Sequence, residues 1–214
     1  RRARLIVDST FLTPWGLRPL ELGADIVVHS ASKYLAGHND TIAGALVVGT
    51  PALIDDISFI ATMTGAILSP HDSWLTLRGL KTLSLRMERS QQNALAIAQW
   101  LADHPKVTEV HYPGLKDHPS HQLLRDQGSA FGSVVSFSVA DAEKAQSVLN
   151  QTRLILLAES LGGVETLITY PWSQTHPTMP PEERVRIGIH DHLLRLSVGI
   201  ENIDDLIEDL DQAL

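Results

Sequence analysis

Two segments near the N-terminus place polar side chains directly after short apolar runs. Asp8 follows Leu5-Ile6-Val7, and Ser30-Ala31-Ser32-Lys33 follows the run at residues 24–29. If both runs are strands of one parallel sheet, their carboxyl ends lie at the same edge, where open α/β sheets bind ligands. A carboxylate, two hydroxyl groups and an amine would then share one site.

This set of groups matches the needs of pyridoxal phosphate, which requires an amine for its aldehyde, an acid against its pyridine nitrogen and donors for its phosphate. Lys33 would be the amine, Asp8 the acid, and Ser30 and Ser32 the phosphate donors. Covalent capture of a buried lysine also removes the cost of desolvating an ammonium group. A simpler alternative stays open, because an Asp after a strand is commonly a turn residue and Lys33 could be a solvated surface amine.

The elements that would position these groups alternate between strand and helix. Residues 5–7 and 24–29 are predicted to be buried strands of a parallel sheet, joined by a helical crossover at residues 17–22 that ends at Gly23. The apolar run at residues 42–48 predicts a third strand. Together these runs indicate one edge of an α/β sheet.

The rest of the chain predicts a long helix and then a smaller α+β unit. Helical spacing covers residues 51–62, and cap-type residues at 69–73 precede one helix from about Trp74 to Trp100, weakened at Gly79. Such a length suits a connector between domains. Further along, strands are expected at residues 107–112, 133–139 and 193–198, and amphipathic helices at 140–150 and 203–213.

Composition limits the classes of partner. Of 214 residues, 43% are hydrophobic and 20% charged, which is ordinary for a folded globular protein. A net charge of −8 argues against nucleic acid, and the absence of an 18-residue apolar run argues against a membrane span. With no cysteine, disulfides and thiolate metal sites are excluded, and a cytoplasmic location fits. No metal site is expected, since His118 and His121 lack a clear further ligand.

Five ordered blocks of the chain resemble one known family. They are Val7-Asp8-Ser9-Thr10-Phe11-Leu12-Thr13-Pro14, His29-Ser30-Ala31-Ser32-Lys33-Tyr34-Leu35-Ala36-Gly37-His38, Ser69-Pro70-His71-Asp72-Ser73-Trp74 with Arg78-Gly79-Leu80-Lys81-Thr82-Leu83, Glu159-Ser160-Leu161-Gly162-Gly163-Val164-Glu165, and Leu194-Arg195-Leu196-Ser197-Val198-Gly199-Ile200-Glu201. Together they resemble the pyridoxal-phosphate enzymes of trans-sulfuration: cystathionine γ-synthase, cystathionine β- and γ-lyase and methionine γ-lyase. The spacing between Asp8 and Lys33 agrees as well.

The resemblance implies roles for particular residues. Lys33 is then the catalytic lysine, with Asp8, Thr10, Ser30 and Ser32 as the other contacts to pyridoxal 5'-phosphate. Arg195 is the implied anchor of the substrate carboxylate, which a planar guanidinium can hold through two parallel hydrogen bonds. Ser160 adds a further substrate contact.

The resemblance also implies a fold and an assembly. The fold class is α/β: residues 1–80 are the C-terminal part of the large, mainly parallel-sheet domain of a fold-type I transferase, and residues 81–214 are the interdomain helix and a small α+β domain. We expect the natural protein to extend further at its N-terminus. It is expected to act on small amino acid substrates as a homotetramer, a dimer of dimers.

The reaction type depends on a weaker likeness. Ile168-Thr169-Tyr170-Pro171 followed by Gln174-Thr175-His176 looks more like bacterial γ-synthases than β-lyases. The preferred interpretation is therefore γ-replacement of an O-acylated homoserine with cysteine. The alternatives are cystathionine β- or γ-lyase, methionine γ-lyase, and a non-catalytic fragment of such an enzyme.

Overall fold

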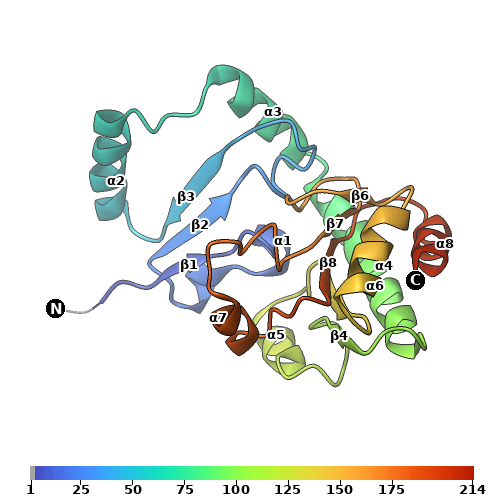
Figure 1. The fold of residues 1–214 in the computed structure, drawn as a ribbon. Helices are drawn as coiled ribbons and strands as arrows, with labels where there is room; N and C mark the ends of the chain where they lie inside the picture. The colour runs from blue at the N-terminus through green and yellow to red at the C-terminus, as the bar shows by residue number, and fades with distance from the viewer. Residues whose placement is uncertain (1–2) are drawn as a thin grey trace.

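The computed structural model describes residues 3–214, which form two sheets (Figure 1). The first sheet holds β1 (Ile6–Asp8), β2 (Ile26–Ser30) and β3 (Gly44–Val48), in that order. β1 runs parallel to β2, as predicted, and β3 is antiparallel to β2. Helix α1 (Thr13–Gly16) and the short 3-10 helix η1 (Pro19–Leu22) join the first two strands. η1 ends at Gly23, whose φ of +98° suits glycine and confirms the predicted crossover.

The prediction that β1 is buried is wrong, and β3 is also largely exposed. Ile6 in β1 is 58% exposed and Leu46 in β3 is 54% exposed, whereas Val27 in β2 is only 3% exposed. The reason is that little packs on this sheet within residues 3–214: helix α2 (Pro51–Thr64) contacts β3 but buries only its own Leu53. Figure 1 shows α2 and α3 at the outer side of the three strands.

The single helix expected from about Trp74 to Trp100 is wrong, because two helices occupy this stretch. α3 spans Pro70–Leu80 and α4 spans Leu83–Asp103. The low helix propensity of Gly79 signals a weak point but does not place a break. Packing requires a glycine there, since a Cβ on Gly79 would lie 2.1 Å from the carbonyl oxygen of Ala36.

The second sheet has the strand order β4-β5-β8-β7-β6 and is mainly antiparallel. Its strands are β4 (Glu109–His111), β5 (Val134–Ser138), β6 (Leu156–Leu157), β7 (Leu167–Thr169) and β8 (Leu193–Ser197). The remaining helices are α5 (His121–Gln127), α6 (Ala142–Gln151), α7 (Pro181–Arg186) and α8 (Ile203–Ala213). The predicted strands at β4, β5 and β8 and the predicted helices at α6 and α8 are confirmed. β6, β7, α5 and α7 were not predicted, since they are short and lack a clear period.

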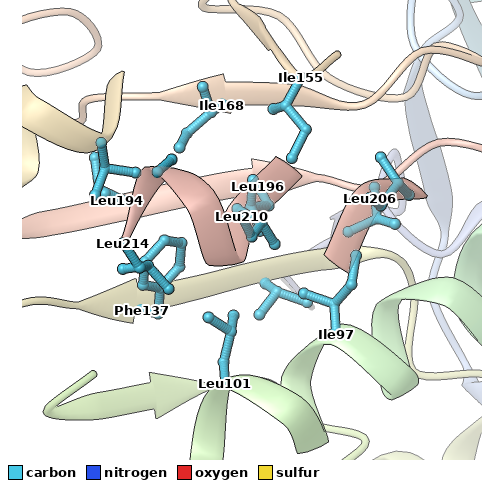
Figure 2. Packing of buried hydrophobic residues seen from close by; sticks show 14 of the residues in the cluster. Ile97, Leu101, Phe137, Ile155, Ile168, Leu194, Leu196, Leu206, Leu210 and Leu214 are labelled. Atoms are coloured by element: carbon cyan, nitrogen blue, oxygen red, sulfur yellow. The ribbon is translucent and has the colours of Figure 1, made fainter. Parts of the chain in front are cut away.

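The main hydrophobic core lies between this sheet and helices α4, α6 and α8. Figure 2 shows Ile97 and Leu101 of α4 pointing into the cluster that also holds Phe137 of β5 and Leu206 and Leu210 of α8. All five side chains are 0% exposed. This packing makes β8, the middle strand, a rigid base for any side chain it carries.

A smaller hydrophobic cluster surrounds the segment after β2. It contains Tyr34 and Leu35 from that segment, Leu83 and Met87 from α4, and Leu161 from the loop between β6 and β7. The segment at residues 31–37 is thus held between α4 on one side and the second sheet on the other.

Residues 3–214 contain neither a membrane-spanning helix nor a cluster of metal ligands. None of the helices in residues 3–214 is long and apolar enough to cross a bilayer. The described His, Asp and Glu side chains form no group of three with metal-ligand geometry. His118 and His121 instead use their Nδ1 atoms locally, with the Ser120 backbone N–H (3.1 Å) and the Pro113 carbonyl oxygen (2.8 Å).

Arg86 of α4 joins the two helices to the segment after β2. Its guanidinium donates to the carbonyl oxygens of Tyr34 (2.8 Å) and Gly79 (2.9 Å), and its Nε donates to the Thr82 hydroxyl oxygen (3.1 Å). The side chain is 6% exposed, and burial lowers its pKa. A buried cation is tolerated here because its donors are paired.

We predict that Arg86→Leu destabilises the fold by about 2–5 kcal/mol, because the Tyr34 carbonyl oxygen would be buried without its donor and the Gly79 carbonyl oxygen would keep only its bonds from Thr82. Urea unfolding followed by circular dichroism measures the change. Arg89→Leu, an exposed position on the same helix, is the control and should change stability by less than about 0.5 kcal/mol. Equal losses in the two variants would contradict the role given to Arg86.

Candidate active site

Asp8 and Ser30 meet where the parallel strands β1 and β2 end. The Thr10 backbone N–H donates to Asp8 Oδ1 (2.9 Å), and the Ser30 backbone N–H donates to the Thr10 hydroxyl oxygen (2.8 Å). The hydroxyl group and the backbone N–H of Thr10 lower the pKa of Asp8. The carboxylate is therefore ionised at neutral pH and fixed at the sheet edge.

Lys33 lies on a compact turn that follows β2. The Lys33 N–H donates to the Ser30 carbonyl oxygen (3.1 Å), and the Gly37 N–H donates to the Lys33 carbonyl oxygen (2.8 Å). Its Nζ donates to the Ser160 hydroxyl oxygen (2.8 Å). Burial lowers the pKa of the Lys33 amine, and the nearby cation of Arg195 lowers it further. Residues 127 positions apart in the chain thus meet at this amine.

A cavity of about 510 Å³ joins these groups. Asp8, Thr10, Ser30 and Lys33 line it, together with apolar side chains such as Phe11. The structure therefore brings four of the predicted cofactor contacts to one opening.

Ser32, the remaining predicted cofactor contact, has a different position. Its hydroxyl group donates to the Ala43 carbonyl oxygen (3.2 Å) and accepts from the Ala43 N–H (2.8 Å). These bonds tie the lysine turn to the residue just before β3. A phosphate contact from Ser32 stays a prediction and would require its hydroxyl group to exchange one of these partners.

Arg195 lies on β8, with Ser136 of β5 and Thr169 of β7 as its strand neighbours. Its Nη2 donates to the Glu159 carbonyl oxygen (2.9 Å) and to the Thr169 hydroxyl oxygen (3.2 Å). Its Nε is buried without a partner among the described residues. Burial lowers the pKa of Arg195. The guanidinium thus lies beside Ser160 with donor capacity to spare.

Two neighbours of Lys33 were not singled out from the sequence. Tyr34 is 2% exposed and points its hydroxyl group toward Ser133 (2.9 Å). Gly162 has a φ of +82°, and a Cβ there would lie 2.7 Å from the Tyr34 nitrogen. The only sequence signal was their presence in the resembling blocks, since a tyrosine beside a lysine and a glycine in a loop are common.

Comparison with known proteins identifies the family. A family model described as "Cys/Met metabolism PLP-dependent enzyme" matches residues 1–214. The chain is 49% identical over 210 residues to cystathionine gamma-lyase of Bacillus subtilis, which covers 98% of this chain and 55% of the relative. It is 47% identical over 215 residues to cystathionine gamma-synthase of Mycobacterium bovis, which covers 100% of this chain and 55% of the relative.

Solved structures show the same fold. Cystathionine gamma synthase of Xanthomonas oryzae pv. oryzae, in complex with aminoacrylate and cysteine, matches with a TM-score of 0.96 and 44% identity, over 99% of this chain and 55% of that one. Cystathionine gamma-lyase of Lactobacillus plantarum, complexed with L-serine, matches with a TM-score of 0.93 and 44% identity, over 97% and 55%. The chain spans about half the length of the relatives it matches. The α/β fold of this enzyme class is confirmed, and the chain belongs to the family of pyridoxal-phosphate-dependent enzymes of Cys/Met metabolism.

Proposed function

We propose that this chain carries the catalytic lysine and the substrate-carboxylate arginine of a pyridoxal-phosphate enzyme that makes or breaks a C–S bond in an amino acid. One observation carries the proposal: the Lys33 amine faces the cavity that holds Asp8 and bonds to Ser160, which adjoins Arg195. Asp8, proposed for the cofactor, and Arg195, proposed for the substrate carboxylate, are therefore both close to the Lys33 side chain.

The residues at the cavity fit pyridoxal phosphate. Asp8 offers an ionised carboxylate for the pyridine nitrogen, and Lys33 offers an amine of lowered pKa for the aldehyde carbon. The Ser9 hydroxyl group lines the same cavity and is buried without a partner among the described residues, which leaves a polar atom beside Asp8 for a bound group. We assign Thr10, Ser30 and Ser32 to the cofactor as well.

When bound, pyridoxal phosphate supplies a protonated ring that accepts the electrons released at the substrate Cα. Asp8 holds the proton on the ring nitrogen, because its lowered pKa keeps it anionic. Arg195 holds the substrate carboxylate through its planar guanidinium and so orients the Cα–H bond. Lys33 takes the Cα proton as a neutral amine, and Ser160 accepts a hydrogen bond from that amine and keeps it in place.

We infer γ-replacement as the reaction, with an O-acylated homoserine and cysteine as substrates. The segment at residues 168–176 supports this choice, as does the likeness to proteins named cystathionine gamma-synthase. A lyase is the second candidate, because equally similar relatives are named cystathionine gamma-lyase, cystathionine beta-lyase and L-methionine gamma-lyase. Incubating the complete natural protein with O-acylhomoserine and cysteine, and separately with cystathionine, distinguishes them. Cystathionine formation supports the synthase; release of thiol and keto acid from cystathionine alone supports a lyase.

We also propose that the complete protein works as a homotetramer. The support is the apolar surface on α2 and α3, where Phe59 is 66% exposed, Met63 69% and Trp74 59%. Several large apolar side chains exposed on two consecutive helices favour an interaction surface. Sedimentation of the complete protein tests the assembly, and a monomer would contradict it.

Lys33→Ala should abolish the visible absorbance of bound pyridoxal phosphate, because the amine that captures the aldehyde would be lost. Borohydride reduction of the complete protein followed by peptide mapping should place the pyridoxyl label on Lys33. Lys81→Ala, on an exposed lysine at the α3–α4 junction, is the control and should keep the absorbance. A label on any other lysine would refute the assignment.

Arg195→Lys should lower kcat/KM by about 100-fold or more for each amino acid substrate, because an ammonium group cannot make the two parallel hydrogen bonds of a guanidinium. Cofactor absorbance should stay the same, since Arg195 does not line the Asp8 cavity. Arg184→Lys is the control for replacing a guanidinium by an ammonium group, because Arg184 stacks on Trp172 in a different part of the domain. Unchanged kinetics in Arg195→Lys would mean that the carboxylate binds elsewhere.

A further inference from the structure

Tyr34, the residue after the catalytic lysine, links the turn that follows the first sheet to the second sheet. Tyr34 belongs to the lysine turn, yet its hydroxyl oxygen accepts a hydrogen bond from Ser133 (2.9 Å), which directly precedes β5. Tyr34 is 2% exposed and Ser133 is 0% exposed. Burial raises the pKa of the phenol, so it stays protonated and can also donate.

The second polar neighbour of this phenol is Ser197, the last residue of β8. Its hydroxyl group lies close enough to Tyr34 to oppose the rise in the phenol pKa. Ser197 is opposite Val134 of β5, so the two serines approach Tyr34 from the same end of adjacent central strands. Arg195 lies two residues before Ser197 on the same strand.

The loop that carries Ser160 is fastened at the same place. The Gly162 N–H donates to the Ser197 hydroxyl oxygen (2.8 Å). A Cβ on Gly162 would lie 2.7 Å from the Tyr34 nitrogen and 3.1 Å from the Lys33 Cβ. This loop therefore rests directly on the backbone of the lysine turn, and only glycine allows that approach.

We propose that the Tyr34 hydroxyl group is a positioning group that sets where the Lys33 amine lies relative to the Arg195 guanidinium. The proposal rests on the function proposed above. A phenyl ring would fill the same space in the small cluster, so packing alone does not call for a hydroxyl group. Ser133, just before β5, hydrogen-bonds to it, and Ser197, at the end of β8, lies close to it. A buried polar set of this kind favours a single arrangement of the parts that it joins.

The variants that test this remove one hydroxyl group each. Tyr34→Phe and Ser133→Ala break the hydrogen bond from either side, and the double variant shows whether the two act through it. Tyr112→Phe is the matched control: Tyr112 is 0% exposed, and its hydroxyl group donates to the Gly132 carbonyl oxygen (2.8 Å). It removes a buried tyrosine hydroxyl group that lies near Tyr34 but makes no hydrogen bond to the lysine turn.

The first measurement needs no cofactor. In the cofactor-free complete protein, competitive acylation of Lys33 followed over pH by mass spectrometry reports the pKa of its amine. Tyr34→Phe should move that pKa upward, toward the ordinary value for lysine, because a looser turn lets the amine move away from Arg195 and toward water. Tyr112→Phe should leave it unchanged.

The second measurement uses the cofactor-loaded protein. Tyr34→Phe should lower kcat by about tenfold while KM changes less than about threefold, because proton transfer depends more steeply on position than carboxylate binding does. The double variant should be no worse than Tyr34→Phe. Three results would each overturn the proposal. The first is an unchanged Lys33 pKa and kcat in Tyr34→Phe, and the second is the same changes in Tyr112→Phe. The third is additive losses of kcat in the double variant. If borohydride labels a lysine other than Lys33, the proposed function fails, and the acylation result still decides whether Tyr34 positions the amine.

Discussion

The structure depends on how the turn after β2 is enclosed. Its carbonyl groups face α4, where Arg86 donates to Tyr34 and Gly79 together. Its opposite side packs against the loop at Gly162, so closely that a Cβ on Gly162 would lie 2.7 Å from the Tyr34 nitrogen. Buried carbonyl groups must be paired and close-packed surfaces cannot shift freely, so the turn has one position. Lys33 inherits that position.

Enclosure also determines the electrostatics of the site. Lys33 and Arg195 are both partly removed from water, and burial lowers the pKa of each. Bringing two cations together is unfavourable, and the cost falls on the group that can lose its proton. Arginine keeps its charge, so the effect appears as a lowered pKa of the Lys33 amine. At Asp8 the charged form is favoured instead, because hydrogen bonds from Thr10 stabilise the carboxylate and lower its pKa. One site thus holds an amine of lowered pKa, a carboxylate and a guanidinium cation.

The two parts of the fold differ in how complete their packing is. The second sheet has helices α4, α6 and α8 over a core that includes Phe137 and Leu196, both 0% exposed. The first sheet leaves apolar side chains in solvent, with Ile42 91% exposed. The site lies where the well-packed part meets the poorly covered part.

The sequence by itself determined the local elements and the chemical groups. Period and capping signals located β2, β5, β8, α6 and α8, and polar residues at strand ends pointed to Asp8 and Lys33, because these depend on near neighbours in the chain. Tertiary structure alone decided that Lys33 meets Ser160 and Arg195. It also decided which groups bond to Tyr34, how far β1 is exposed and where α3 ends. Each depends on residues far apart in the chain, and no local period records which distant carbonyl, hydroxyl or guanidinium group a residue will meet.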